Sequence, residues 1–270
     1  MSQILEDQVV FITGGGSGLG AAAARRLARD GAIPVINDLS IESAQRIADE
    51  VGGLAYAFDV SDSAAFDEAV DDAVSRLGRL DIMINNAGIA PQNASDKIAA
   101  QMENVGKRMA GQIDQISPMN YLLDTSDTDW DRMIKVHLYG TFYGCRAALR
   151  HMQPRRRGRI INISSVLGLY PSPGAAHYSV AKAGIIALTK SVAGEVAPLG
   201  INVNTVCPGY IDTPLLTPFS EQLRAGITMR IGKGRMGTAE ELAEMIRFLS
   251  GPESEYCTGD VFPVSGGYTG

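Results

Sequence analysis

The chain has 270 residues, a net charge of −6 and a hydrophobic content of 45%, which is enough core for one large globular domain or two small ones. The mild acidity argues against nucleic acid binding, and no apolar run approaches the ~18 residues of a membrane span. Three scattered cysteines form neither a disulfide framework nor a metal site, and the N-terminus lacks a signal-peptide pattern, so a cytoplasmic location is expected.

Seven apolar, β-rich runs alternate with helical patterns along the chain, which predicts a parallel, doubly wound α/β sheet with right-handed crossovers. The first four runs are apolar throughout, as is typical of strands covered on both faces. No change in composition marks a boundary, so residues 1–270 are expected to form a single domain. The runs are VVFIT (9–13), IPVIN (33–37), LAYAF (54–58), LDIMIN (80–85), RIINIS (159–164), INVNTVC (201–207) and VFPVS (261–265).

The first run is followed by TGGGSGLG (13–20). Ligands of such sheets lie beyond the carboxyl ends of the strands. Three glycines would allow a tight turn and a close approach to a pyrophosphate, and a helix beginning near Ser17 would direct free amides towards it. We therefore expect nucleotide binding by this turn, although a plain strand-to-helix turn has a similar sequence. The residues concerned are Gly14, Ser17, Gly18, Leu19 and Gly20.

The second run is followed by Asp38 and Leu39, 18 and 19 residues beyond Gly20. A carboxylate at this spacing accepts hydrogen bonds from the ribose hydroxyls of NAD and repels the 2′-phosphate of NADP. The segments GGG and DLS offer no Arg or Lys to bind that phosphate, so NAD is the expected cofactor. Asp38 or Ser40 could also cap the helix that follows.

The third and fourth runs end in FDVSD (58–62) and NNAG (85–88). Asp59 could contact the adenine amino group, with Val60 packed on the ring, or Asp59 or Ser61 could only cap a helix. The second segment has small residues that suit a chain edge running along a cofactor: Asn86, Ala87 and Gly88.

The sixth run is followed by CPGYIDTP (207–214). Pro208 and Gly209 would turn the chain there. The backbone of Ile211 and the hydroxyl of Thr213 would then be available to meet a carboxamide.

Taken together, these motifs resemble those of the short-chain dehydrogenase/reductase family over roughly residues 5–268, apart from one segment. The motifs appear in family order: TGxxxGxG (13–20), NNAG (85–88), a serine thirteen residues before YxxxK (165, 178, 182) and PGxxxT (208–213). The resemblance implies a Rossmann-type sheet of seven parallel strands with helices on both faces. It also implies a nicotinamide cofactor and a homotetramer, with a dimer as the alternative.

The segment HYSVAK places Tyr178 and Lys182 four residues apart, on one face of a helix. A phenol with a pKa of about 10 is a poor base at neutral pH, but the lysine ammonium and the positive charge of NAD⁺ would lower that pKa. Lys182 should also bind the nicotinamide ribose, and Ser165 should hold the substrate oxygen near Tyr178. Ser164 competes for the role of Ser165, but strand alternation places the two side chains on opposite sides, and the family spacing selects Ser165.

His137 stands in VHLYG where the family usually has Asn in VNxxG. In the family this residue helps to hold a water linked to the lysine, largely through a main-chain carbonyl, and a carbonyl survives the change to His. The imidazole could also shuttle protons and add a pH dependence near neutrality, or only fill space.

Residues 89–126 are longer than the matching part of the family, and residues 98–116 carry an apolar stripe at helical spacing. They predict an inserted helix, either packed on the body or forming a cap over the substrate. Lys97, Lys107 and Arg108 could meet a phosphate-bearing carrier such as coenzyme A. Residues 214–236 are expected to form a lid. The stripe comprises Ile98, Met102, Val105, Met109, Ile113 and Ile116, and the expected substrate-pocket walls are Leu167, Tyr170, Tyr210 and Phe219, beside Ser165 and Tyr178.

The sequence thus predicts an NAD-dependent dehydrogenase that interconverts a secondary alcohol and a ketone, with a mostly apolar small-molecule substrate and no metal. A 3-oxoacyl-thioester reductase, acting on coenzyme A or carrier-protein thioesters, would share every motif. An NAD-binding sensor or assembly protein without catalysis is the alternative from another class.

Overall fold

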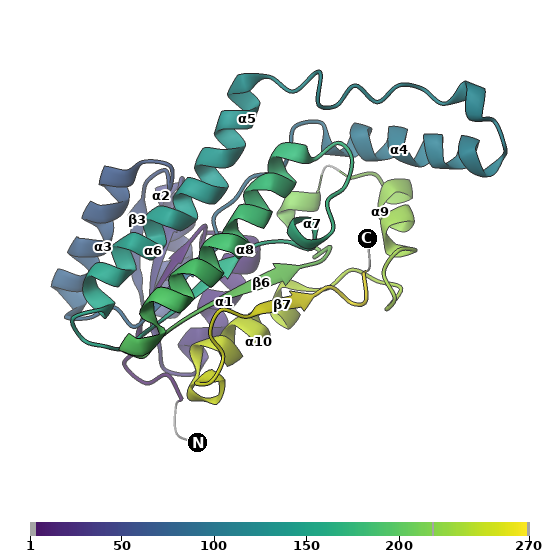
Figure 1. The fold of residues 1–270 in the computed structure, drawn as a ribbon. Helices are drawn as coiled ribbons and strands as arrows, with labels where there is room; N and C mark the ends of the chain where they lie inside the picture. Colours follow the sequence, from purple (N-terminus) through teal and green to yellow (C-terminus); the bar gives the residue numbers. More distant parts are fainter. Residues whose placement is uncertain (1–3, 218, 269–270) are drawn as a thin grey trace.

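The chain forms an all-parallel sheet of seven strands in the order β3-β2-β1-β4-β5-β6-β7, which confirms the predicted doubly wound fold (Figure 1). The structure, a computed structural model, describes residues 4–217 and 219–268. Every predicted strand is found within two residues of its expected bounds. The strands are β1 (Val9–Thr13), β2 (Ile33–Asp38), β3 (Leu54–Ala57), β4 (Ile82–Asn85), β5 (Gly158–Ile163), β6 (Ile201–Pro208) and β7 (Val261–Val264).

Helices connect the strands. The α-helices are α1 (Gly18–Arg29), α2 (Ile41–Val51), α3 (Ser63–Leu77), α4 (Ala94–Met109), α5 (Asp127–Ile134), α6 (Gly140–Met152), α7 (Val166–Leu169), α8 (Ala176–Val196), α9 (Glu221–Thr228) and α10 (Ala239–Ser250). A π-helix, η2 (Lys135–Tyr139), joins α5 to α6, and short 3₁₀ turns are η1 (Ile113–Gln115), η3 (Ala197–Leu199), η4 (Pro214–Leu216) and η5 (Pro252–Ser254).

Helices cover both faces of the sheet. Successive side chains of each strand point to opposite sides, so a single strand contributes to the packing on both faces. In β1, Val10 and Ile12 pack with α1, α2 and α10, whereas Val9 and Phe11 pack with α3, α6 and α8. Two separate apolar cores result, one on each face of the sheet. Within the described ranges, no helix is both long and apolar enough to cross a membrane.

The edge strand β3 differs from its prediction. Leu54, Ala55 and Tyr56 are half-buried and Ala57 is exposed, so this run is not covered on both faces. Only β2 pairs with it, because β3 ends the sheet.

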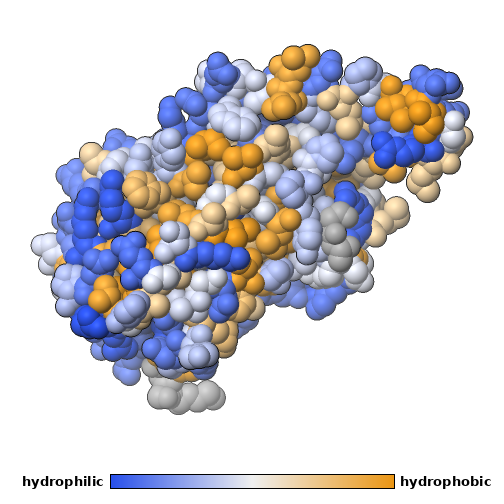
Figure 2. All heavy atoms as spheres, viewed as in Figure 1, coloured by the Kyte–Doolittle hydropathy of each residue, from blue (hydrophilic) through white to orange (hydrophobic). Residues whose placement is uncertain are grey.

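Residues 94–126, called the arm below, leave the carboxyl edge of the sheet and extend away from the body before they return to α5 (Figure 1). The predicted helix is present as α4, but it ends at Met109, and Gly111 follows with a φ of 74°. Ile113 and Ile116 therefore do not continue the apolar stripe of α4. Figure 2 shows hydrophobic side chains on the outer part of the arm, where Met109 is 85% exposed.

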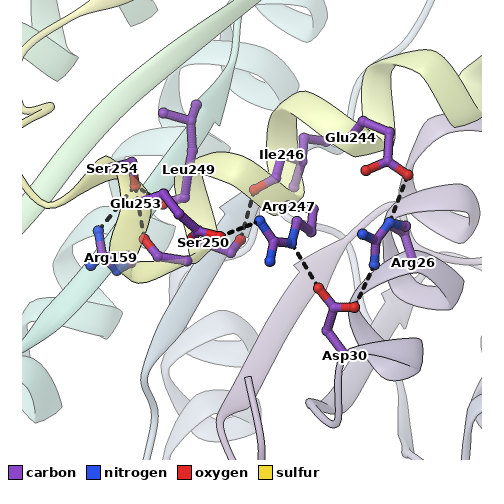
Figure 3. A network of polar contacts seen from close by, with 11 residues as sticks. Arg26, Asp30, Arg159, Glu244, Ile246, Arg247, Leu249, Ser250, Glu253 and Ser254 are labelled. Atoms are coloured by element: carbon purple, nitrogen blue, oxygen red, sulfur yellow. Dashed lines mark hydrogen bonds and ion pairs between the residues drawn. The ribbon is translucent and has the colours of Figure 1, made fainter. Parts of the chain in front are cut away.

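Helices α1 and α10 come from opposite ends of the sequence and are joined by a polar network (Figure 3). Asp30 accepts hydrogen bonds of 2.7 Å from both Arg26 and Arg247, and Arg26 also donates to Glu244 at 2.6 Å. Burial alone would raise the pKa of Asp30, but the hydrogen bonds from the two arginines outweigh it and hold that pKa below its usual value. Arg247 continues the network to Glu253.

Candidate active site

A cavity of 870 Å³ opens at the carboxyl ends of the strands, a size within the range of small-molecule and cofactor sites. Its walls come from the loops after β1, β2, β3, β4, β5 and β6, with α5, α8 and the arm. Nearly all the cofactor, catalytic and substrate residues predicted from the sequence line it, and the two exceptions are Gly20 and Tyr170. Lys107 and Arg108, predicted to meet a phosphate-bearing carrier, also lie outside it.

The turn after β1 contains the glycines that its geometry requires. Gly14 has a φ of 62°, and a Cβ there would lie 2.9 Å from Cα of Ala87. Gly20 faces the turn instead of the cavity, and a Cβ at this position would collide with the Gly14 carbonyl oxygen. Ser17 makes no side-chain cap, so the first amides of the twelve-residue helix α1 remain free to bind an anion, and Gly14, Ser17, Gly18 and Leu19 line the cavity.

The carboxylate of Asp38 lies over the glycine turn. Its Oδ2 accepts a hydrogen bond of 3.1 Å from the Gly16 amide, and both Asp38 and Leu39 line the cavity. Ser40, one of the two alternatives, is the residue that caps α2. The sequence did not indicate a role for Arg46, which lies in the middle of α2. Its guanidinium donates to the Gly16 carbonyl at 2.7 Å, and Gly16 is also the residue whose amide binds the Asp38 carboxylate.

Asp59 and Val60 also line the cavity. Asp59 accepts hydrogen bonds of 2.8 Å from the amide and the hydroxyl of Ser61. The cap of α3 is Asp62, so neither Asp59 nor Ser61 has the capping role that was the alternative for them.

The segment after β4 is fastened to the turn after β1. The Asn86 side chain donates to the carbonyls of Thr13 and Gly14, and the Thr13 hydroxyl accepts from the amides of Asn86 and Ala87. Gly88 lies against His137, because a Cβ there would be 2.5 Å from Cε1 of the imidazole. Asn86, Ala87 and Gly88 thereby form a continuous wall beside the glycine turn.

Ser165, Tyr178 and Lys182 converge in the cavity. The Ser165 hydroxyl accepts from the Leu167 amide at 3.1 Å and lies near enough to the Tyr178 phenol to influence its pKa. Ser164 points the other way and donates to the Lys182 carbonyl at 2.7 Å. The alternation expected for the two serines is therefore present, and Ser165 is the one within reach of the phenol.

The charges in this cluster differ from the sequence expectation. Burial raises the pKa of Tyr178, while the nearby Ser165 hydroxyl acts in the opposite direction. Burial also lowers the pKa of Lys182 to about 7, and its Nζ donates to the Ile163 carbonyl at 2.8 Å. The lowered phenol pKa was expected from two positive charges, of which only Lys182 belongs to the chain, and in the folded chain burial is the largest influence on the phenol.

His137 lies in the π-helix η2, where the backbone hydrogen bonding of the helix is rearranged. Its Nε2 lies 3.2 Å from the amide nitrogen and 3.0 Å from the carbonyl oxygen of Ile89, and its ring packs edge-on against Tyr178, 5.2 Å between centres. Its own carbonyl accepts from Thr141 at 2.8 Å. Burial, with Lys182 nearby, holds the pKa of His137 well below 6.5, so a titration near neutrality is not expected from this imidazole.

The loop after β6 closes the other side of the cavity. The Gly209 amide donates to the Val264 carbonyl at 3.0 Å, and a Cβ on Gly209 would lie 2.8 Å from Cα of Ser265. Ile211 pairs with Gly237 through an isolated bridge. Pro208, Gly209, Ile211 and Thr213 all line the cavity.

The far end of the cavity is apolar. Leu167, Tyr210 and Phe219 line it, but Tyr170 lies outside and is 46% exposed, because the four-residue helix α7 ends just before it. The lid region 214–236 and the arm meet here. The Ile98 side chain of α4 packs in one cluster with Leu223 and Ile227 of α9 and with Tyr210 and Phe219.

Comparison with known proteins identifies relatives over most of the chain. Residues 8–224 match the model of the short chain dehydrogenase family. The chain is 35% identical over 268 residues to the 3-oxoacyl-(acyl-carrier-protein) reductase FabG of Thermotoga maritima, with 97% of this chain and 98% of that protein covered. It is 34% identical over 264 residues to the enzyme of the same name from Escherichia coli, with 97% of each chain covered.

Proposed function

The chain belongs to the short-chain dehydrogenase family, and on this basis we propose that it is an NAD(H)-dependent oxidoreductase that interconverts a secondary alcohol and a ketone with Tyr178 as the acid–base group. The family membership gives the reaction class at the level of alcohol and keto groups. The cofactor, the roles of individual residues and the substrate are proposals.

The observation that carries the proposal is that Ser165, Tyr178 and Lys182 line the same cavity as the glycine turn. A carbonyl oxygen placed between the Ser165 and Tyr178 hydroxyls would accept from both. In ketone reduction Tyr178 gives its proton to that oxygen, and in alcohol oxidation it accepts the proton. A nicotinamide supplies or removes the hydride when it is bound.

Lys182 has two tasks in this proposal. Its low pKa of about 7 allows it to gain and lose a proton near neutrality, and its ammonium lies 5.6 Å from the centre of the phenol ring, so a hydroxyl or water between the two groups would pass that proton to Tyr178. Lys182 also lines the cavity, where it would bind the ribose next to the nicotinamide.

The glycine turn fits the pyrophosphate of a dinucleotide, since a Cβ at Gly14 would fill the space above Ala87 and the first amides of α1 are free. Asp38 favours NAD(H), because its carboxylate would repel a 2′-phosphate. Arg46 acts against this preference, since it brings a positive charge near the same place. Asp38 lines the cavity whereas Arg46 does not, so we assign the preference to Asp38.

The comparisons favour one substrate class within this reaction. Two relatives that match nearly the full length of the chain are named as 3-oxoacyl-(acyl-carrier-protein) reductases. A 3-oxoacyl thioester is therefore the better-supported substrate, ahead of a simple secondary alcohol. Its reduction gives a 3-hydroxyacyl thioester and consumes one hydride and one proton.

The test is turnover by the purified protein with NADH, NADPH, NAD⁺ and NADP⁺. The panel contains 3-oxoacyl thioesters, simple ketones, secondary alcohols and hydroxysteroids. Turnover of a ketone or alcohol with NAD(H), at least tenfold faster than with NADP(H), supports the proposal. NADH binding, seen by fluorescence, without turnover of any compound would instead support a binding or assembly protein.

We also propose a homo-oligomer, with a tetramer as the expected form. The aromatic side chains of Tyr139 and Phe142, on η2 and α6, are 44% and 42% exposed, and Val180 of α8 is 48% exposed. Light scattering of the purified protein tests this, and a monomer at micromolar concentration would contradict it.

A further inference from the structure

The wall of the active-site cavity contains two positively charged side chains that the proposed reaction does not use. Lys97 comes from α4 in the arm, and Arg132 comes from α5. Neither forms an ion pair within the described part of the chain, whereas Lys135, a neighbour on the same wall, is paired with Asp131 at 3.2 Å. Two unpaired cations in one cavity favour binding of a negatively charged group.

The backbone of Lys97 is held beside the catalytic helix. The Tyr121 hydroxyl donates to the Lys97 carbonyl at 2.7 Å, and the Tyr121 ring also packs near Gly174 in the loop before α8. A Cβ on Gly174 would lie 3.4 Å from Cβ of Lys97. The arm is thus fixed at this point to the loop that leads into Tyr178.

The other two positively charged residues of the arm, Lys107 and Arg108, lie outside the cavity wall. Lys107, on the same helix, is paired with Glu103 at 2.7 Å and does not line the cavity. Arg108 is exposed and also lies outside the cavity wall. Of the three cations in the arm, only Lys97 can therefore reach a molecule that is bound beside Tyr178.

We propose that Lys97, assisted by Arg132, binds an anionic group of the substrate, a carboxylate or a phosphate, while the keto group lies at Ser165 and Tyr178. The inference rests on the proposed function and narrows its substrate class. The substrate is amphipathic: its apolar part contacts Ile98, Tyr210 and Phe219, and its charged part contacts the arm. A purely apolar ketone would leave Lys97 with only the Tyr121 ring, whose centre lies 5.8 Å from Nζ.

Three substrates with the same reacting unit separate the possible sources of the charge. Acetoacetyl-coenzyme A carries phosphates, acetoacetate carries a carboxylate, and the acetoacetyl thioester of N-acetylcysteamine is neutral. Their kinetics are compared in wild type, Lys97→Gln, Arg132→Gln and the control Lys107→Gln. We expect Lys97→Gln to raise KM for an anionic substrate about tenfold, as for loss of one charged hydrogen bond, with less than a twofold change for the neutral thioester.

The identity of the affected substrate decides between phosphate and carboxylate. The KM of wild type for that substrate should also rise with ionic strength, and Lys97→Gln should lose part of this dependence. Equal effects of Lys97→Gln on charged and neutral substrates, or an effect as large in Lys107→Gln, would overturn the inference and leave the proposed function standing.

Binding measured without turnover separates a failure of the proposed function from a failure of this inference. Calorimetry with coenzyme A and with 3-hydroxybutyrate is done on wild type and Lys97→Gln, each saturated with NAD⁺. Loss of binding of either compound in Lys97→Gln supports the anion site even if no ketone is reduced. Unchanged binding of both compounds, or binding of neither to wild type, overturns it.

Discussion

Lys182 and Tyr178 lie one turn apart on α8, with Nζ of Lys182 5.6 Å from the centre of the phenol ring and hydrogen-bonded to the Ile163 carbonyl. The amine thus sits behind the ring and is held by the end of β5. No hydrogen bond joins this amine to the phenol oxygen, and Ser165 is the neighbouring hydroxyl that influences the pKa of the phenol.

Tyr178→Phe removes the proton donor and keeps the ring that packs against His137. We expect kcat to fall by about 10²- to 10⁴-fold, the range for loss of a general acid–base group, with NADH affinity within a few-fold of wild type. Steady-state kinetics and NADH fluorescence measure the two effects. The matched control is Tyr170→Phe, outside the cavity, which should behave as wild type, and a fall below tenfold in Tyr178→Phe would contradict its assigned role.

Lys182 should make the stability of the cofactor-free protein depend on pH. Its pKa is about 7 in the folded chain against an ordinary 10.5, so the unfolded chain binds more protons between these values. Its contribution to the free energy of unfolding therefore rises with pH above about 7, by at most ~1.4 kcal/mol per pH unit, and is lost as pH falls towards 7. Urea unfolding at pH 7, 8 and 9 should show the stability of wild type increasing relative to Lys182→Met. The exposed Lys190, on the same helix, gives the control Lys190→Met, and a pH-independent difference for Lys182→Met would refute the prediction.

Asp38→Ala should change the choice of cofactor. Removal of the carboxylate relieves repulsion of a 2′-phosphate and removes the acceptor for the ribose hydroxyls, so kcat/KM with NADPH relative to NADH should rise about tenfold or more. Asp59→Asn, on the next loop, should weaken both cofactors to a similar extent. If the ratio is unchanged in Asp38→Ala, the assignment of the preference to this carboxylate fails.

His137→Ala should lower activity without altering its pH profile. The pKa of His137 lies well below 6.5, so the imidazole stays neutral from pH 6 to 9 and has no proton to release in that range. The loss in rate follows from the freed Ile89 backbone and the space left beside the Tyr178 ring. Profiles of kcat/KM for wild type, His137→Ala and the surface control His151→Ala test this. An inflection near pH 6.5 that disappears only in His137→Ala would restore the proton-relay hypothesis.

Ile98→Ala should raise KM for the true substrate several-fold with little change in kcat. The side chain joins the arm to the lid cluster over the apolar end of the cavity, and its loss loosens that cover without touching Tyr178. Val105→Ala is the matched control, since Val105 is 46% exposed on the same helix. Unaltered KM in Ile98→Ala would mean that the arm is no cap.

The fold was predictable because buried parallel strands are nearly continuous apolar runs, and a handful of residues at their carboxyl ends mark the cavity. The half-exposed edge strand β3 was not predictable in the same way. Its run LAYAF looks as apolar as that of β4, and its exposure depends on the strand order, which places it last in the sheet.

Sequence patterns gave wrong predictions where one backbone conformation or a contact between distant residues determines the structure. The apolar period continues through Ile113, but the positive φ of Gly111 follows the end of α4. Tyr170 has the composition of a pocket wall, and the end of α7 turns it outwards. Arg46 and Arg132 become recognisable only when residues from separate helices meet at one place, whereas Lys97 was already a candidate from the sequence, together with Lys107 and Arg108, which lie outside the cavity wall.

The network of Asp30 with Arg26 and Arg247 has a consequence for the order in which a usable enzyme is made. The helix that begins at the glycine turn is clamped by α10, so the earliest part of the chain to emerge during synthesis must wait for nearly the last before its position is fixed. A chain that ends before residue 239 would contain the loops that line the cavity but lack Glu244 and Arg247, so Asp30 would keep only its bond from Arg26.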